Sequence, residues 1–267
     1  TNMPHFSDLK KHNESLDFKI TNVKVCIVNG LKRVCQDEIL TLGFRNEPYE
    51  NSTIKVITNE TSSHNEIMSH RFSMIPIIFN DVETFPLEKY KFVVNVTNKS
   101  QSFVDVTTEN IEMYLLETDI DSNNANEIPV TKQNTDKSMQ PSALFPADQI
   151  SGDHILIHNL GPGSTLHIEA MATLSNGLEN ALYSPVSKCI FFNTLPNMEM
   201  EKKSRVDIKL QREFQKNVDG EAFNFDFNLE GIGMYDPERI ILRGLIVLHD
   251  KFVKFLENTK KQINKLS

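Results

Sequence analysis

The last part of the chain carries a pattern of large apolar residues that a helix would gather on one face. They recur at alternating spacings of four and three residues: Ile241, Leu245, Leu248, Phe252 and Phe255. This rhythm is typical of a helix that packs along a second helix. Asp236, Pro237 and Glu238 precede it and favour a helix start, because they cap free amides, fix a helical backbone angle and complement the positive helix end. The pattern therefore predicts a long helix with an apolar seam.

A second amphipathic helix is expected near the other end of the chain, around residues 29–39. Its apolar residues also share one face: Ile27, Leu31, Val34, Cys35 and Ile39. Lys32 and Arg33 form a basic pair on its flank. Gly30 costs such a helix roughly 1 kcal/mol relative to alanine, so it is either a tolerated glycine or a point where another helix approaches closely. The alternating residues 16–25 before this helix predict a strand.

Short β-like segments dominate the middle of the chain, from about residue 48 to residue 186. Strands are expected at 53–58, 91–97, 102–108, 111–117, 154–157 and 165–174. A short helix is predicted at 64–73, and Pro76 ends it because proline cannot continue the hydrogen-bond ladder. The polar stretch 119–140 predicts a mobile loop. Residues 223–227 alternate strictly between apolar and polar and predict a half-buried strand.

This order of segments predicts an α+β protein with one domain inserted into another. The first domain would be built from both ends of the chain, residues 1–47 and 188–267, and the β-rich residues 48–187 would form the inserted domain. The 267 residues are enough for two modest domains, and 39% hydrophobic residues are enough for a packed core.

The chain is acidic, with a net charge of −8. Binding of nucleic acid over a broad face needs clustered Lys and Arg, so we expect little direct contact with nucleic acid. No apolar run reaches the roughly 18 residues of a membrane span, and we expect no membrane association. Residues 1–9 are polar and lack the apolar core of a secretion signal.

We expect no metal site and no catalytic site in this chain. Its cysteines, Cys26, Cys35 and Cys189, form no Cys-x-x-Cys pair and predict buried free thiols in a reducing compartment. A metal shared by His154, His158 and His167 is an alternative that their mixed strand faces disfavour. The chain lacks the His-Glu-x-x-His, Gly-x-Ser-x-Gly and phosphate-loop patterns, and the acidic residues 117–121 predict a solvated loop.

Two segments resemble the family of RNA polymerase assembly subunits, which comprises bacterial alpha, archaeal D and the third-largest subunit of nuclear polymerases. The first is similar to an Asn-Ala-Leu-Arg-Arg helix, matched by Asn29, Leu31, Lys32 and Arg33. Gly30 stands in place of alanine, and Lys32 replaces an arginine and so cannot make bidentate contacts. The second is similar to a helix and turn containing Ala-His-Arg, matched by Glu66, His70, Arg71, Ile75 and Pro76.

Three more segments follow in the family's order: a strand pair at 160–170, a loop at 177–187 and a strand–turn–helix at 223–251. In the loop, Glu179, Ala181 and Tyr183 are followed by a matching Ser-Pro-Val, with Tyr183 in place of tryptophan. Where the family has two lysines and a histidine in this loop, the chain has other residues. The resemblance therefore implies no electrostatic role for the loop in this chain. The family's cysteine-rich loop has no match in the chain.

The resemblance implies a non-catalytic assembly subunit of a multisubunit DNA-dependent RNA polymerase, in which both chain ends form a dimerisation domain. It implies an interface with a small L-like subunit: Ile27, Leu31, Val34, Ile241, Leu245, Leu248, Phe252 and Phe255. Docking of the two large catalytic subunits would involve Lys32, Arg33, His70 and Arg71. This chain would hold no cofactor, because magnesium is expected on the large subunits.

The implied partners also include other small polymerase subunits, and the implied location is inside the cell. That location is the nucleus, or the host cytoplasm or virion if the polymerase is that of a large DNA virus, a source compatible with the abundance of Asn, Ile and Lys. Two alternatives remain open at this point. One is a homodimer in the style of bacterial alpha, and the other is a stand-alone β-rich binding module.

Overall fold

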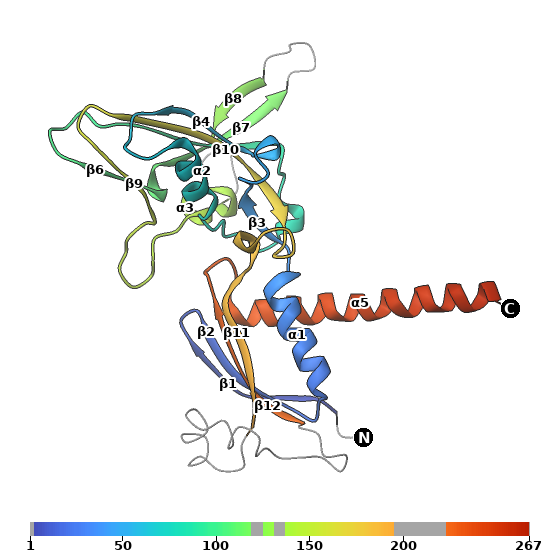
Figure 1. The fold of residues 1–267 in the computed structure, drawn as a ribbon. Coiled ribbons are helices and arrows are strands. Elements are labelled where there is room, and N and C mark those ends of the chain that lie inside the picture. The colour runs from blue at the N-terminus through green and yellow to red at the C-terminus, as the bar shows by residue number, and fades with distance from the viewer. Residues whose placement is uncertain (1–2, 119–124, 131–136, 195–222, 267) are drawn as a thin grey trace. The chain divides into compact units, whose positions relative to one another are not determined.

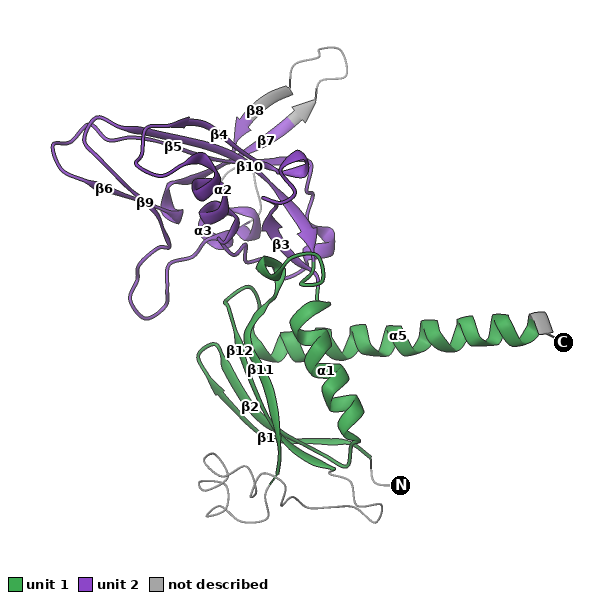
Figure 2. Cartoon of the chain, viewed as in Figure 1, with its two compact units in different colours: residues 1–39, 176–267 green, residues 40–175 purple. Residues whose placement is uncertain are grey.

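The computed structural model describes residues 3–118, 125–130, 137–194 and 223–266. The protein belongs to the α+β class, with antiparallel sheets and α-helices (Figure 1). The chain divides into two compact units (Figure 2). Unit 1 combines the two ends of the chain, residues 1–39 and 176–267, and unit 2 comprises residues 40–175.

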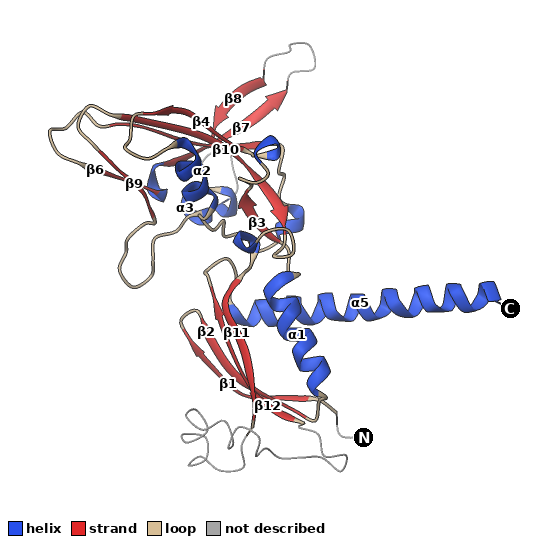
Figure 3. Cartoon of the chain, in the orientation of Figure 1, coloured by secondary structure: helices blue, strands red, loops and turns tan. Residues whose placement is uncertain are grey.

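Unit 1 contains a four-stranded antiparallel sheet (Figure 3). Its strands lie in the order β1 (His5–His12), β2 (Ser15–Thr21), β12 (Asn224–Gly231) and β11 (Val186–Asn193). The α-helices of this unit are α1 (Val25–Asp37) and α5 (Pro237–Leu266). Two strands from the first end of the chain and two from the last end therefore lie side by side in one hydrogen-bonded sheet, and the pairing of β2 with β12 joins those ends into a single unit.

One face of this sheet forms a core because apolar and polar residues alternate along its central strands. Its buried residues are Leu16, Phe18 and Ile20 of β2 with Phe225, Phe227 and Leu229 of β12. Phe18 and Phe227 stack with their ring centroids 4.9 Å apart, and Phe227 lies 6.1 Å from Phe191 on β11. The helix α1 contacts β11 and buries its own apolar stripe.

The two helices of unit 1 meet at a glycine of α5. A Cβ atom added at Gly244 would lie 2.6 Å from the Cys35 sulfur and 3.3 Å from a Leu31 methyl carbon. Contacts that short are not compatible with ordinary packing, so only glycine lets α5 approach α1 this closely. Gly30 on α1 is less constrained, because its added Cβ would meet Leu248 at 3.7 Å, an ordinary contact distance.

The Cys35 thiol is enclosed at this crossing. It lies 4.0 Å from the Ile240 carbonyl oxygen of α5. A hydrogen bond with the neighbouring Cys189 thiol, together with burial, raises the pKa of Cys35. Cys35 and Cys189 are therefore the buried free thiols that the sequence predicts, whereas the prediction is wrong for Cys26, which is exposed at the start of α1.

Unit 2 contains a larger antiparallel sheet in the order β3, β10, β5, β7 and β8, with β4 also paired to β10. The bounds of its strands are β3 (Thr41–Phe44), β4 (Ile54–Asn59), β5 (Tyr90–Thr97), β7 (Ile111–Thr118), β8 (Ala125–Pro129) and β10 (Thr165–Ser175). A separate two-stranded sheet pairs β6 (Val104–Thr107) with β9 (Leu156–Leu160). The α-helices are α2 (Asn65–Ser73) and α3 (Pro141–Leu144).

Aromatic rings form the centre of the unit 2 core. Phe44 lies between Phe72 of α2 and Phe92 of β5, with centroid distances of 4.9 and 5.3 Å. Phe145, just after α3, lies 5.8 Å from Phe92. These rings are buried and connect the short helices to the sheet. The position of α2 against β4, described below, is fixed by this packing.

The unit boundaries differ from the predicted domain boundaries by several residues. The sequence places them at 47/48 and 187/188, whereas the chain changes unit after Ile39 and after Ser175. The reason is that β3 pairs with the last residues of β10, from Thr41 with Ser175 to Phe44 with Ala172, which assigns both segments to unit 2. β11 begins at Val186 and belongs to the unit 1 sheet.

Individual elements follow their predicted positions where the local pattern is strong. The helix predicted at 64–73 is α2, and the predicted strand at 165–174 is β10. The predicted strand at 16–25 ends at Thr21 instead, and Val25 is already helical. The predicted loop 119–140 includes β8 and a 3-10 turn at Lys137–Met139, while residues 119–124 and 131–136 of that prediction lie outside the described residues.

None of the described helices is both long and apolar enough to cross a membrane. Among the same residues, no cluster of three or more His, Cys, Asp or Glu side chains is arranged to hold a metal ion. His154, His158 and His167 are therefore not gathered into such a cluster.

Replacement of Gly244 tests the contact between α1 and α5. Gly244→Ala is expected to lower the free energy of unfolding by about 1–3 kcal/mol, because the added methyl group overlaps the enclosed Cys35 sulfur. Gly30→Ala is the matched control in the facing helix, and it is expected to raise stability by up to about 1 kcal/mol through helix propensity. Urea unfolding of both variants measures the difference, and equal stabilities would contradict the close approach.

Candidate functional site

The exposed half of α5 is the first candidate functional surface. α5 has 30 residues and α1 has 13, which at about 1.5 Å per residue correspond to lengths of about 45 and 20 Å. α1 can therefore cover only part of α5. Lys251 of α5 donates to Glu38, next to the last residue of α1, at 2.6 Å. Beyond that ion pair the helix extends away from the unit 1 sheet (Figure 1).

The predicted interface residues fall into three groups by exposure. Leu31, Val34 and Ile241 are buried within unit 1, so they belong to the core of this chain and do not form an accessible surface. Leu245 and Leu248 are half-buried. Ile27, Phe252 and Phe255 are exposed, with 71% of Phe255 accessible. The predicted seam is thus an internal contact at its first residues and an exposed surface at its last ones.

Sequence reasoning missed a second apolar stripe on the same helix. Its residues are exposed and recur at helical spacing: Leu242, Ile246, Val253, Leu256 and Ile263. The helical spacing of these residues is visible in the sequence. The stripe that begins at Ile241 contains the aromatic residues Phe252 and Phe255, and the sequence pattern therefore favours it as the apolar face of the helix. We define the α5 surface as these exposed residues together with Phe252 and Phe255. Contiguous exposed apolar residues of this size mark sites of interaction between proteins.

The basic pair of α1 lies in unit 1. Arg33 is exposed and Lys32 is half-buried. The Lys32 backbone carbonyl accepts a weak hydrogen bond from the Cys189 thiol at 3.8 Å, which ties this turn of α1 to β11. The guanidinium of Arg33 is thus accessible to a partner, while the opposite face of α1 packs on β11.

The second predicted docking pair, His70 and Arg71, lies in unit 2 on the last turn of α2. Both side chains are exposed, while their neighbours Met68 and Phe72 are buried. The Ser73 hydroxyl donates to the His70 carbonyl oxygen at 2.7 Å and helps to end the helix before Pro76. Basic residues at this helix end are favourable because they complement the negative end of the helix dipole.

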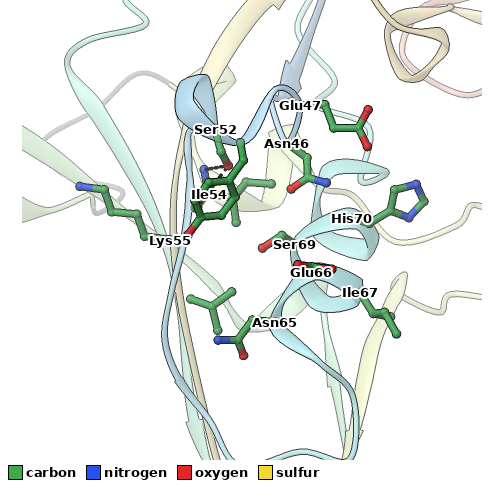
Figure 4. Close-up of a pocket in the computed structure, with 12 residues that line it drawn as sticks. Asn46, Glu47, Ser52, Ile54, Lys55, Asn65, Glu66, Ile67, Ser69 and His70 are labelled. Atoms are coloured by element: carbon green, nitrogen blue, oxygen red, sulfur yellow. Dashed lines mark hydrogen bonds between the residues drawn. The ribbon is translucent and has the colours of Figure 1, made fainter.

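His70 also lines an open groove of about 920 Å³ in unit 2 (Figure 4). One wall is β4 with the loop before it, and the other wall is α2. Its lining residues include Asn46, Glu47, Ser52, Ile54, Val56, Asn65, Glu66, Ser69 and His70. We call this the α2–β4 groove. Its mixed polar lining and its open shape fit a segment of polypeptide better than an enclosed small molecule.

A buried histidine in unit 2 is coupled electrostatically to this region. His158 on β9 is only 9% exposed, and its Nδ1 atom is buried with no hydrogen-bond partner among the described residues. Burial, and secondarily the positive charge of Arg71, hold the pKa of His158 below its ordinary value. Both effects disfavour the protonated imidazole relative to an exposed histidine.

Comparison with known proteins relates the chain to polymerase subunits. No family model matches it. It is 22% identical over 276 residues to the DNA-directed RNA polymerase II subunit RPB3 of Schizosaccharomyces pombe, and the match covers 93% of this chain and 84% of that subunit. It is 25% identical over 191 residues to the RNA polymerase II subunit rpb3 of Dictyostelium discoideum, and this match covers 69% of this chain and 56% of that subunit.

Removal of the Arg71 charge is expected to raise the pKa of His158. In Arg71→Gln the burial of the imidazole remains but the repulsion of its protonated form is lost. A titration of the His158 ring protons by NMR measures this shift, and Lys55→Gln is the control because that lysine does not affect His158. An unchanged pKa in the Arg71 variant would contradict the coupling.

The same coupling has a consequence for stability. The pKa of His158 in the folded chain lies below the ordinary value of 6.5. At a pH between these two values, the unfolded chain therefore binds more protons at this residue than the folded chain does. The contribution of this residue to stability is present above the ordinary pKa and decreases as the pH falls below it. Arg71→Gln is expected to make that decrease smaller.

Proposed function

The chain belongs to the RNA polymerase alpha/RPB3 family, and from that premise we propose that it is a non-catalytic assembly subunit of a multisubunit DNA-dependent RNA polymerase. The observation that carries the proposal is the extent of the similarity, which spans 93% of the chain and therefore includes both units. The exposed apolar residues of α5 support it, because an assembly subunit needs a surface of this kind for a partner.

We propose that a small L-like subunit covers the α5 surface. Leu242, Ile246, Phe252, Phe255 and Leu256 are each more than half exposed, and burial of such side chains in an interface is favourable by about 1.5–3 kcal/mol each before the costs of association. Aromatic residues near the centre of an interface usually dominate its free energy. Phe252 and Phe255 are the candidates for that role.

We propose that the large catalytic subunits dock on the two basic pairs. Arg33 with Lys32 lies in unit 1, and His70 with Arg71 lies in unit 2, so each unit carries one of the two pairs. Nucleotide addition and its magnesium would reside on the large subunits, and other small subunits would complete the complex. The expected location is intracellular: the nucleus, or the host cytoplasm or virion if the polymerase is viral.

Affinity purification of the tagged chain from its native source tests the proposed function. The two large catalytic polymerase subunits and a small L-like subunit are expected to co-purify in comparable amounts. Purification of the chain without any polymerase subunit would overturn the proposal and favour a stand-alone binding module. A mass measurement on the chain expressed alone separates the heterodimer from the homodimer, because a stable mass of two copies would favour a partner of the same sequence.

A charged residue in the α5 surface is expected to weaken partner binding strongly. Phe255→Asp should weaken binding to the small subunit by roughly 30-fold or more, because a carboxylate replaces a large apolar contact. The same variant should keep the unfolding free energy of the isolated chain, since Phe255 is 71% exposed. Co-expression followed by quantitative pull-down and urea unfolding measures both quantities.

Lys254→Gln is the matched control, because it makes the same change in net charge at an exposed position that lies on the side of α5 away from the apolar stripe. It should leave binding within about twofold of the original chain. Leu248 is unsuitable for this test, because it is half-buried against α1 and its replacement would disturb the core. Normal binding by Phe255→Asp would exclude the α5 surface as the interface.

A further inference from the structure

β4 is an edge strand that faces the α2–β4 groove. It pairs with β10 along one side, from Ile54 opposite Ala170 to Asn59 opposite Leu166. No other described strand pairs with its second side, and α2 lies beside it instead. An edge strand presents a row of backbone donors and acceptors, which is the feature that another extended chain can recognise.

The hydrogen bonds around β4 show which residues face the groove. The Thr53 carbonyl oxygen accepts from the Met171 amide of the β10 strand at 3.1 Å, so this carbonyl is directed toward β10, while the Thr53 amide donates to the Arg45 carbonyl oxygen at 2.9 Å. Because these directions alternate along a strand, Ile54 and Val56 direct their amide and carbonyl groups to the opposite side. The Ser52 hydroxyl lies 3.3 Å from both the amide and the carbonyl of Ile54 on that side.

Val56 is the next outward-facing residue, and it lines the groove together with Ile54 and Ser52. A hydrogen bond from a short hydroxyl side chain to neighbouring backbone groups is an alternative to pairing of those groups with another strand. The groove beside these residues has a volume of about 920 Å³.

The opposite wall of the groove carries polar and acidic side chains. Ser69 and Glu66 of α2 lie toward β4, and Glu47 lies near the end of the groove (Figure 4). Glu47 and Glu66 are exposed, and no ion pair within the described residues neutralises either carboxylate. Lys55, the only lysine of the lining, is directed away from α2. The groove is therefore complementary to a basic side chain.

We propose that the α2–β4 groove binds an extended segment of a partner polypeptide, which adds a strand to the edge of β4 and places a Lys or Arg side chain beside Glu47 and Glu66. Backbone bonds to Val56 would provide the register, and the carboxylates would select basic segments. A segment of about six residues matches the length of β4, at about 3.3 Å per residue. The inference goes beyond the proposed function, since it names the chemistry of a second binding site in unit 2 and does not involve α5.

A short basic peptide tests this binding mode directly. The probe is a fluorescein-labelled peptide with the sequence Val-Lys-Val-Lys-Val-Lys, titrated with the full chain by fluorescence polarisation. Two further probes have the same sequence and charge but carry N-methyl groups, one on the valines and the other on the lysines. Strand addition uses the amides of only one of these sets. One N-methylated peptide should therefore bind at least about tenfold more weakly, while the other keeps most of its affinity.

Two variants of the chain test the site itself. Val56→Pro removes the outward amide of the edge strand without removing a bond to β10, and it should weaken binding of the unmodified peptide by about tenfold or more. Glu66→Lys should weaken binding by a similar factor through charge repulsion. Glu83→Lys is the control, because it makes the same change in net charge at an exposed position of unit 2 outside the groove.

Each outcome is informative. Loss of binding with one N-methylated peptide and with Val56→Pro, but not with Glu83→Lys, supports strand addition. Equal weakening by both Glu→Lys variants would show non-specific attraction to an acidic protein and would overturn the proposal. Equal binding of the two N-methylated peptides, or no binding of the unmodified peptide up to ~1 mM, would also overturn it. Circular dichroism of Val56→Pro verifies folding, and the peptide comparison does not depend on that variant.

Discussion

The close contact between α1 and α5 is the interaction on which the rest of unit 1 depends. It brings together a helix from the first 40 residues and a helix from the last 31, and it does so at a glycine where any side chain would overlap Cys35. The sheet of this unit joins a pair of strands from each chain end through the pairing of β2 with β12, so neither end supplies the whole sheet. Unit 2 is inserted in the sequence between the two segments that form unit 1.

The two candidate binding surfaces use different physical interactions. The α5 surface is an apolar stripe on a helix, where affinity comes from removing aromatic and aliphatic side chains from water. The α2–β4 groove offers backbone hydrogen-bonding groups and two carboxylates, which provide register and charge selection instead. A subunit that must hold several different partners benefits from this difference, because a partner suited to one surface has little affinity for the other.

Much of the fold could be predicted from local patterns, and the exceptions have identifiable causes. The periodicity of 241–255 correctly indicated a long helix, and the alternation at 223–227 correctly indicated a strand. β1 and β3 were not predicted, because β1 consists mainly of exposed polar residues and β3 has only four residues, Thr41–Phe44, all buried without alternation. β3 is defined by pairing with β10, a segment distant in the sequence that a local pattern does not contain, whereas β1 pairs with the neighbouring β2.

The sequence by itself determined which residues of α1 and α5 are apolar and on which helical face they lie, because side-chain chemistry and helix geometry are local properties. It also contained the segments that relate this chain to polymerase subunits. Only the tertiary structure decided that Leu31, Val34 and Ile241 are core while Phe252 and Phe255 are exposed, because α5 is 17 residues longer than the 13-residue α1 that covers it. Likewise, only strand pairing decided that β4 lies at an edge, since which neighbour a strand has depends on the whole sheet.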